Sequence, residues 1–213
     1  AFHELGQLEN SVKSYERSIA IESNYAEAHN NLGNVFRELG ELDMASSSYE
    51  KALIINPDYV EAHFSLSAVL LSFDKLELMI EHLEKAIDIN PGFAEAHHSL
   101  GGGYKELGRL DDAVKSYNKA LALQPNFLEA HNNLGNTFKK LGQLKDAVKS
   151  YEKALAINPD YPSTHNNLGN VYKELGQLSD AARSYQNALT INPDYSDSHN
   201  NLGVIFYELK KYD

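Results

Sequence analysis

Several chemical features are missing from the sequence, and each absence narrows what the chain can be. It has no cysteine, which excludes a disulfide framework and a thiolate metal site. It has no long apolar run, since the stretch AVLL at 68–71 is far shorter than the ~20 residues of a membrane-spanning helix. Basic residues are scarce, because 19 Lys and Arg stand against 30 Asp and Glu and leave a net charge of -11. Such a surface repels a phosphate backbone, so we expect neither a membrane nor a nucleic-acid partner.

Motifs for catalysis and cofactor binding are also missing. No serine, histidine and acid recur together as a catalytic triad requires. The three glycines at 101–103 invite comparison with a phosphate-binding loop. A dinucleotide fingerprint, however, needs glycine where Glu106 stands, and a phosphate loop needs lysine and a hydroxyl residue where Arg109 and Leu110 stand. We interpret the glycines as a weak helical segment, since each costs ~1 kcal/mol relative to alanine, and we predict neither an enzyme nor a cofactor.

The chain does have a strict internal period of 34 residues. A turn motif follows this spacing, from NPDY at 56–59 through NPGF at 90–93 and QPNF at 124–127 to NPDY at 158–161 and 192–195. A fixed period of this length indicates stacked repeats, in which each repeat buries its apolar face only against its neighbours. Histidine recurs in the same register, at His29, His63, His97, His131, His165 and His199.

Each repeat has the pattern of two helices. Within residues 128–161, apolar side chains recur at helical spacing from Leu134 to Leu141 before Gly142 interrupts the pattern. A second apolar stripe then runs over 144–155, and Pro159 ends it, because the residue before a proline is pushed out of the helical region. The repeat is therefore predicted to be a helical hairpin.

Numbered from Ala26 as repeat position one, the repeats resemble the tetratricopeptide repeat (TPR). That pattern asks for Leu at position seven, Gly at eight, an aromatic residue at eleven, Ala at twenty, an aromatic residue at twenty-four, Ala at twenty-seven and Pro at thirty-two. The first full repeat matches it with Leu32, Gly33, Phe36, Ala45, Tyr49, Ala52 and Pro57.

The resemblance covers the whole chain and implies an all-α fold, a right-handed superhelical solenoid of antiparallel helix pairs. We expect a single array over 1–213, with full repeats at 26–59, 60–93, 94–127, 128–161 and 162–195 and partial repeats at 1–25 and 196–213. The repeat at 60–93 is expected to pack least regularly, because it departs from the pattern at Ser67, Leu70, Asp74, Met79 and Leu83.

Two rows of polar residues have both a structural and a functional interpretation. The histidines at position four could suggest a metal site, but one per repeat lacks the i, i+4 pair of a helical zinc site, so we expect packing residues and no metal. Position two carries the acidic row Glu27, Glu61, Glu95, Glu129 and Asp197. Residues 58–61 and 126–129 fit the spacing of a capping box, which favours a structural role over ligand recognition.

Asparagine crowds the first helix of several repeats at positions five, six and nine, as in the motif HNNLGN. We expect no packing reason for it, because Asn is a poor helix former and a solvated face favours Glu, Lys or Gln. The alternative is a polar surface copied by duplication. The TPR resemblance implies that these positions, followed by Lys or Arg at position twelve, line a concave groove. The candidate peptide-binding residues are Asn30, Asn31, Asn34, Arg37, Lys105, Asn132, Asn133, Asn136, Lys139, Asn166, Asn167, Asn170, Lys173, Asn200 and Asn201.

An asparagine amide both donates and accepts hydrogen bonds, so a row of them suits an extended peptide. The position-six row of Asn31, Asn133, Asn167 and Asn201 is similar to the Asn row of the superhelical TPR array in O-linked N-acetylglucosamine transferases. TPR domains that grip chaperone tails place Lys or Arg at positions two, five and six, which this chain does not, so that sub-class is disfavoured. We expect an interaction scaffold that binds an extended peptide or partner segment in its concave groove.

Two alternatives stay open at this point. One is head-to-tail self-assembly, because no second helix follows to cover Leu202, Phe206 and Leu209. The other is a substrate-recruiting arm of a larger enzyme, such as a glycosyltransferase. The expected partner in each case is a protein or peptide.

Overall fold

The computed structural model describes the backbone of residues 2–210 and the side chains of residues 6–210. This part of the chain is helical between short turns. Its elements are α1 Phe2–Ile21, α2 Ala26–Glu38, α3 Leu42–Ile55, α4 Val60–Ser72, α5 Leu76–Ile89, α6 Ala94–Glu106, α7 Leu110–Leu123, α8 Leu128–Lys140, α9 Leu144–Ile157, α10 Pro162–Glu174, α11 Leu178–Ile191 and α12 Ser196–Leu209. None of these helices is both long enough and apolar enough to cross a membrane.

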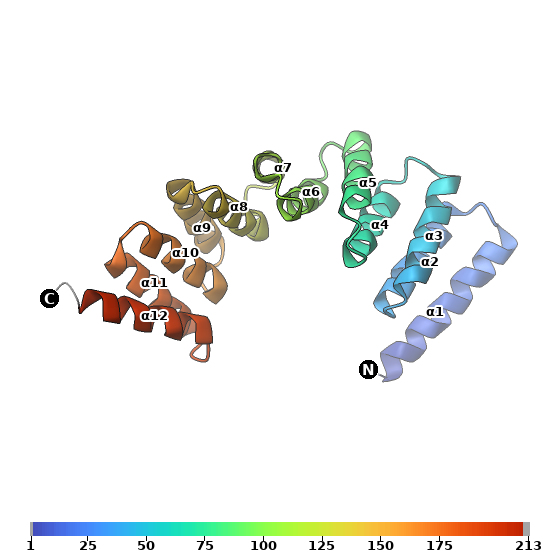
Figure 1. Cartoon of the computed structure of the whole chain (residues 1–213). Coiled ribbons are helices and arrows are strands. Elements are labelled where there is room, and N and C mark those ends of the chain that lie inside the picture. Colours follow the sequence, from blue (N-terminus) through green and yellow to red (C-terminus); the bar gives the residue numbers. More distant parts are fainter. Residues whose placement is uncertain (1, 211–213) are drawn as a thin grey trace. The chain divides into compact units, whose positions relative to one another are not determined.

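The chain divides into two compact units, Ala1–Leu107 and Gly108–Asp213, and each is described by itself. In the first unit α2 pairs with α3 and α4 with α5, while α1 packs on α2 and α6 packs on α5. In the second unit α8 pairs with α9 and α10 with α11, while α7 packs on α8 and α12 on α11. The prediction of antiparallel helix pairs is confirmed (Figure 1). The division falls between α6 and α7, in the middle of the expected repeat 94–127.

A left-handed glycine makes the turn inside each regular hairpin. Between α8 and α9, Gly142 has a φ of 72°. Its N–H donates to the Lys139 carbonyl at 3.0 Å, and the Gln143 N–H donates to the Phe138 carbonyl at 2.9 Å. These two bonds satisfy the last carbonyls of α8, and a residue with a Cβ is strained in this backbone conformation.

The second helix of each hairpin ends in an asparagine turn. At the end of α9, the Asn158 N–H donates to the Ala154 carbonyl at 3.0 Å, and Asn158 itself is extended, as expected for a residue before proline. Its side-chain oxygen accepts a hydrogen bond from the Asp160 N–H at 3.0 Å. The NPDY motif is therefore a side-chain-stabilised turn that leads into the next repeat.

Close approach of the two helices defines the core of a hairpin. The rings of Tyr49, Tyr151 and Tyr185 are fully buried, and each lies against the glycine at position eight of its own repeat. A Cβ on Gly135 would lie 2.7 Å from the Tyr151 ring. This distance is shorter than a van der Waals contact between two carbon atoms, so a side chain does not fit there. Helix packing in these repeats therefore requires glycine beside tyrosine.

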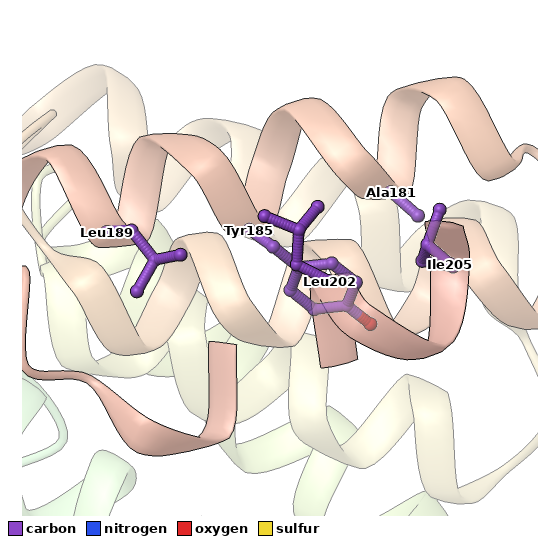
Figure 2. Close-up of a cluster of buried hydrophobic side chains, with 5 residues drawn as sticks. All are labelled: Ala181, Tyr185, Leu189, Leu202 and Ile205. Atoms are coloured by element: carbon purple, nitrogen blue, oxygen red, sulfur yellow. The ribbon is translucent and has the colours of Figure 1, made fainter. Parts of the chain in front are cut away.

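The last helix, α12, packs on α11 through an apolar cluster of Ala181, Tyr185, Leu189, Leu202 and Ile205 (Figure 2). Leu202 is buried and Leu209 is partly buried against this cluster, so the expectation that both are left uncovered is wrong. Phe206 does remain exposed, at 57% of its surface. Residues 211–213 of the expected last partial repeat lie outside the described residues.

The beginning of the chain also differs from expectation. Within the expected partial repeat at 1–25, α1 is one continuous helix of 20 residues. Gly6 stands where the turn glycine stands in later repeats, yet it lies inside α1.

The predicted capping boxes do not form. Helices α4 and α8 begin after Tyr59 and Phe127, and neither N-cap makes a side-chain hydrogen bond. The turn itself is stabilised instead, because the side-chain oxygen of Asn56 accepts from the Asp58 N–H at 3.2 Å. The acidic residues at position two are thus one residue too close to the helix start to cap it.

Repeat 60–93 keeps the regular helix lengths, with 13 residues in α4 and 14 in α5. Its departures are local: Asp74 takes the turn with a φ of 57°, where the other hairpins have glycine. The glycines at 101–103 lie in α6 as predicted, and Gly103 brings α6 close to α5, since a Cβ there would lie 3.1 Å from Ile80 Cγ1.

We predict that Asp74→Gly stabilises the protein, because aspartate in the left-handed region costs about 1 kcal/mol that glycine does not. The greater freedom of glycine in the unfolded chain offsets part of this, so the expected gain is about 0.5 kcal/mol. Chemical denaturation measures it. The matched reverse variant Gly142→Asp should lose stability, and a loss for Asp74→Gly would contradict the argument.

Candidate functional site

The asparagines at position nine have a packing role. The hydroxyls of Tyr49, Tyr151 and Tyr185 donate to the side-chain oxygens of Asn34, Asn136 and Asn170, each at 2.8 Å. Burial raises the pKa of Tyr185 to about 12, so its hydroxyl stays protonated and available as a donor. The expectation that packing does not explain the amides is therefore wrong at position nine.

The asparagines at position five connect neighbouring repeats in the second unit. The Thr164 hydroxyl donates to the Asn132 oxygen at 3.0 Å, and the Ser198 hydroxyl donates to the Asn166 oxygen at 3.0 Å. Each hydroxyl belongs to position three of the following repeat, and both hydroxyl residues are fully buried. These bonds satisfy polar groups at the interface between α8 and α10 and between α10 and α12.

The asparagines at position six extend the same network. Asn201 Nδ2 lies 3.1 Å from the Asn166 oxygen and 3.2 Å from the Asn170 oxygen, and it donates to both. Asn167 Nδ2 donates to the Asn136 oxygen at a longer 3.4 Å. The network therefore runs from a buried tyrosine in one repeat to an amide in the next, and it holds the first helices of the second unit in register.

A pocket of about 350 Å³ opens beside this amide network. It brings together six of the predicted binding residues from α8, α10 and α12, together with two carboxylates. Its lining is Lys139, Asn166, Asn170, Lys173, Glu174, Asp197, Asn200 and Asn201. We call this set the amide pocket.

The amide pocket still has hydrogen-bonding capacity. The oxygens of Asn166 and Asn170 are taken by Ser198, Tyr185 and Asn201, but their Nδ2 atoms donate to no described residue and reach the solvent. Asn200 is exposed, and no residue of the described chain bonds its amide. The pocket therefore offers mainly N–H donors, which suit the carbonyl oxygens of a peptide.

Charges of both signs flank these donors. Lys139 Nζ pairs with Glu174 Oε1 of the next repeat at 3.1 Å. Lys173 and Asp197 also line the pocket, and no carboxylate of the described chain lies within 4.0 Å of Lys173. Lys173 is thus available for an acidic group of a ligand.

The other nine predicted binding residues do not line this pocket, and Asn167 on α10 is one of them. Asn132, Asn133 and Asn136 lie on α8 in the second unit, outside its lining. The first unit holds Asn30, Asn31, Asn34 and Arg37 on α2 and Lys105 on α6, where Lys105 Nζ pairs with Glu106 Oε1 at 3.2 Å.

Our candidate set missed four residues that the site uses. The carboxylates of Glu174 and Asp197 line the amide pocket, and the hydroxyls of Thr164 and Ser198 anchor its asparagines. A signal for the hydroxyls was present in the sequence. Thr and Ser replace the usual Ala of position three 32 residues after an asparagine at position five, as in Asn132 and Thr164.

The histidines at position four form hydrogen bonds that connect each repeat to the turn before it. Their Nε2 atoms lie 2.8 to 3.2 Å from a backbone carbonyl six residues earlier, which belongs to Pro57, Pro91, Pro125, Pro159 and Pro193 and, for His29, to Ser23. Since a carbonyl can only accept, Nε2 carries the proton in each ring. In the described residues no group of three His, Asp or Glu side chains is placed to hold a metal ion.

Repeat 60–93 adds a second histidine to this arrangement. His82 Nδ1 lies 2.8 Å from His63 Nδ1, and His63 Nε2 already donates to Pro57. His82 is therefore the donor between the two rings. Burial, with a smaller contribution from His63, lowers the pKa of His82, while Glu81 and Glu50 act in the opposite direction.

We predict that this pair makes stability depend on pH. The pKa of His82 is lower in the folded protein than the ~6.5 of an unfolded chain, so folding favours the neutral ring. Its contribution is present above about pH 6.5 and is lost as the pH falls below that value. His82→Ser, which restores the serine of the other repeats, should flatten the free energy of unfolding between pH 7 and 5.5. Parallel curves for the two proteins would contradict this assignment.

One asparagine of the first unit lacks the partner that its counterparts have. The side-chain oxygen of Asn30 is buried and accepts no hydrogen bond from a described residue. The hydroxyl that serves Asn132 and Asn166 is absent, because Ala62 occupies that position. A buried acceptor without a donor lowers stability.

We therefore predict that Ala62→Ser raises the free energy of unfolding by about 0.5 to 1.5 kcal/mol. The matched pair is Thr164→Ser, which keeps the hydroxyl on Asn132, and Thr164→Ala, which should lose about 1 kcal/mol relative to it. Thermal and chemical unfolding give these values. No gain for Ala62→Ser would contradict the assignment of Asn30 as an acceptor without a donor.

Family comparisons agree with this geometry. A profile described as TPR repeat matches residues 1–40, 103–142, 135–176 and 169–210. Profiles described as tetratricopeptide repeat match residues 26–59 and 60–93. Among curated proteins, none matches the chain in sequence.

Solved structures show the same fold. YrrB, described as a TPR protein with an unusual peptide-binding site, is 20% identical with a TM-score of 0.77, over 89% of this chain and 97% of YrrB. MamA is 25% identical with a TM-score of 0.70, over 74% of this chain and 92% of MamA. PilF of Pseudomonas aeruginosa is 21% identical with a TM-score of 0.72, over 88% of this chain and 91% of PilF.

Proposed function

Because the chain belongs to the tetratricopeptide repeat family, we propose that it is an interaction scaffold that binds an extended peptide of a partner protein at the amide pocket. The observation that carries this proposal is the gathering of amides, lysines and carboxylates from α8, α10 and α12 around one opening. The peptide lies along the first helices of the second unit. The resemblance to YrrB, whose structure is described by its peptide-binding site, adds support.

The hydrogen-bonding pattern indicates how the peptide is held. Because the scaffold occupies the oxygens of Asn166 and Asn170, these amides bind peptide carbonyls through Nδ2 and do not pair with both edges of a peptide bond. Asn200, whose amide bonds no described residue, supplies a donor and an acceptor. Backbone-directed contacts of this kind tolerate many ligand sequences.

Charge adds selectivity to backbone recognition. Lys173 favours an acidic side chain of the peptide, and Asp197 and Glu174 favour basic side chains or peptide N–H groups. Such exposed charges act on association rate and partner choice more than on affinity. The proposed ligand is therefore an extended segment with mixed charge.

Asn200 and Lys173 allow a direct test of the amide pocket, because both line it and neither makes a hydrogen bond or ion pair to another described residue. Peptides selected from a phage-displayed library on the whole chain would be titrated into Asn200→Ala and Lys173→Gln by calorimetry. We expect each variant to weaken binding by about threefold to tenfold, with unchanged thermal stability. Lys173→Gln should matter less at high salt.

The control is Asn187→Ala, which removes an exposed amide from α11, outside the amide pocket. Its affinity should equal that of the unmodified protein. If Asn200→Ala and Asn187→Ala bind the selected peptides equally well, the amide pocket is not the binding site. Head-to-tail association and a role as the arm of a larger enzyme stay predictions.

A further inference from the structure

A second opening in the second unit shares no residue with the amide pocket. It has a volume of about 680 Å³ and lies between α7, the turn at Pro125, α8 and α9. Leu121, Leu134 and Ile157 give it an apolar lining, and Lys149 and Lys153 give it positive charge. We call it the α7–α9 groove.

No carboxylate lines the α7–α9 groove. Lys149 Nζ lies 3.0 Å from Asp146 Oδ1, but this is an exposed pair that a ligand can replace. Lys153 has no carboxylate within 4.0 Å among the described residues. The positive charges of these two lysines, which lie beside an apolar surface, are therefore only weakly neutralised by nearby carboxylates. This is so although the whole chain carries a net charge of -11.

The lining of the α7–α9 groove can be compared with the equivalent repeat positions 68 residues earlier, around α3 to α5. There Asn118, Asn126, Lys149 and Ala156 are replaced by Glu50, Asp58, Glu81 and Asp88. The surroundings of His63 are thus acidic where the surroundings of His131 are basic. Over the whole sequence, residues 1–107 hold 18 acidic and 7 basic side chains, while residues 108–213 hold 12 of each.

The surroundings of His63 and His131 also differ by one histidine. In the first unit His82 bonds His63 Nδ1 at 2.8 Å, with the ring centres 5.1 Å apart and the ring planes tilted by 40°. In the second unit Ser150 stands at that position, and its hydroxyl bonds the Asp146 carbonyl at 2.8 Å. The groove is therefore left open, and His131 Nδ1 accepts no hydrogen bond from a described residue although His131 is only 6% exposed.

We propose that the α7–α9 groove is a second binding site, which takes a protein segment with an aspartate or glutamate side chain next to a large aliphatic one. The carboxylate pairs with Lys153 and Lys149, and the aliphatic side chain covers Leu121, Leu134 and Ile157. Charge complementarity decides the occupant, because a basic segment is repelled here and an uncharged one leaves Lys153 without a carboxylate partner.

His131, which lines the α7–α9 groove, provides a spectroscopic signal for binding there. Burial, and after it Lys153, lowers the pKa of the His131 ring, although its bond to Pro125 acts in the opposite direction. A carboxylate that neutralises Lys153 removes part of this effect. Binding at the groove should therefore raise the pKa of His131, which a peptide bound at the amide pocket does not do.

The test uses the whole chain and the peptide acetyl-Glu-Leu-Leu-Glu-amide, with acetyl-Gln-Leu-Leu-Gln-amide as its uncharged control. Nuclear magnetic resonance titration follows the backbone signals of α7 to α9 and the His131 ring. We expect the acidic peptide to shift signals at Ile157 and Lys153 and to raise the pKa of His131. The glutamine peptide should bind at least about fivefold more weakly, and added salt should remove most of the difference.

Three variants locate the binding. Lys149→Gln with Lys153→Gln should weaken the acidic peptide about tenfold, whereas Lys140→Gln with Lys210→Gln, which removes the same charge elsewhere, should change it less than about twofold. Ser150→His rebuilds the arrangement of His82 and should block the groove without removing any charge. Its thermal unfolding, compared with that of the unmodified protein, shows whether the fold is kept.

The results separate this proposal from the proposed function. Equal loss in the two double variants would show a general charge effect and overturn the groove. Shifts confined to α10 and α12, or a loss of binding in Asn200→Ala, would assign the acidic peptide to the amide pocket and also overturn it. Failure of library peptides at the amide pocket leaves the groove result unaffected, because the two sites share no residue.

Discussion

The contact between a glycine at position eight and a tyrosine at position twenty-four is the constraint on which each regular hairpin depends. A Cβ on Gly33, Gly135 or Gly169 would meet the tyrosine ring at 2.6 to 2.7 Å, so no side chain fits there. The ring is completely buried, and its hydroxyl must therefore find an acceptor inside the protein. Asparagine at position nine, next to the glycine, supplies it. One packing contact thus accounts for two residues of the HNNLGN motif, the glycine and the asparagine that follows it.

Repeat 60–93 shows the same dependence by its departure from the pattern. Leu83 replaces the tyrosine, and it has neither a ring that needs a glycine nor a hydroxyl that needs an acceptor. Ser67 and Ala68 accordingly replace the glycine and the asparagine, and the Ser67 hydroxyl bonds a carbonyl of its own helix, that of Phe64, at 2.6 Å. In this repeat the three residues change together, as expected if they form one packing unit, whereas repeat 94–127 keeps Gly101 and Tyr117 but has Gly102 at position nine.

The sequence predicted the elements better than the polar contacts between them. Its period and its glycine and proline positions located the helix pairs, because these depend on backbone preferences that act within one repeat. The role of Asn136 could not be predicted in this way. Its partner Tyr151 lies 15 residues away on another helix, and only helix packing brings the two together. The capping boxes failed for a different reason, since α4 begins after Tyr59 and places Glu61 one residue too close to the helix start.

The amide network also limits what the candidate site can recognise. Oxygens of Asn166 and Asn170 are committed to Ser198, Tyr185 and Asn201, so the scaffold fixes their orientation and leaves the nitrogens for a ligand. The same bonds that order neighbouring repeats therefore pre-organise the donors, and a peptide need not immobilise them on binding. In the proposed binding mode, specificity rests on side chains without a structural role, such as Asn200 and Lys173. These can vary among repeats without disturbing the tyrosine, glycine and asparagine that hold each hairpin together.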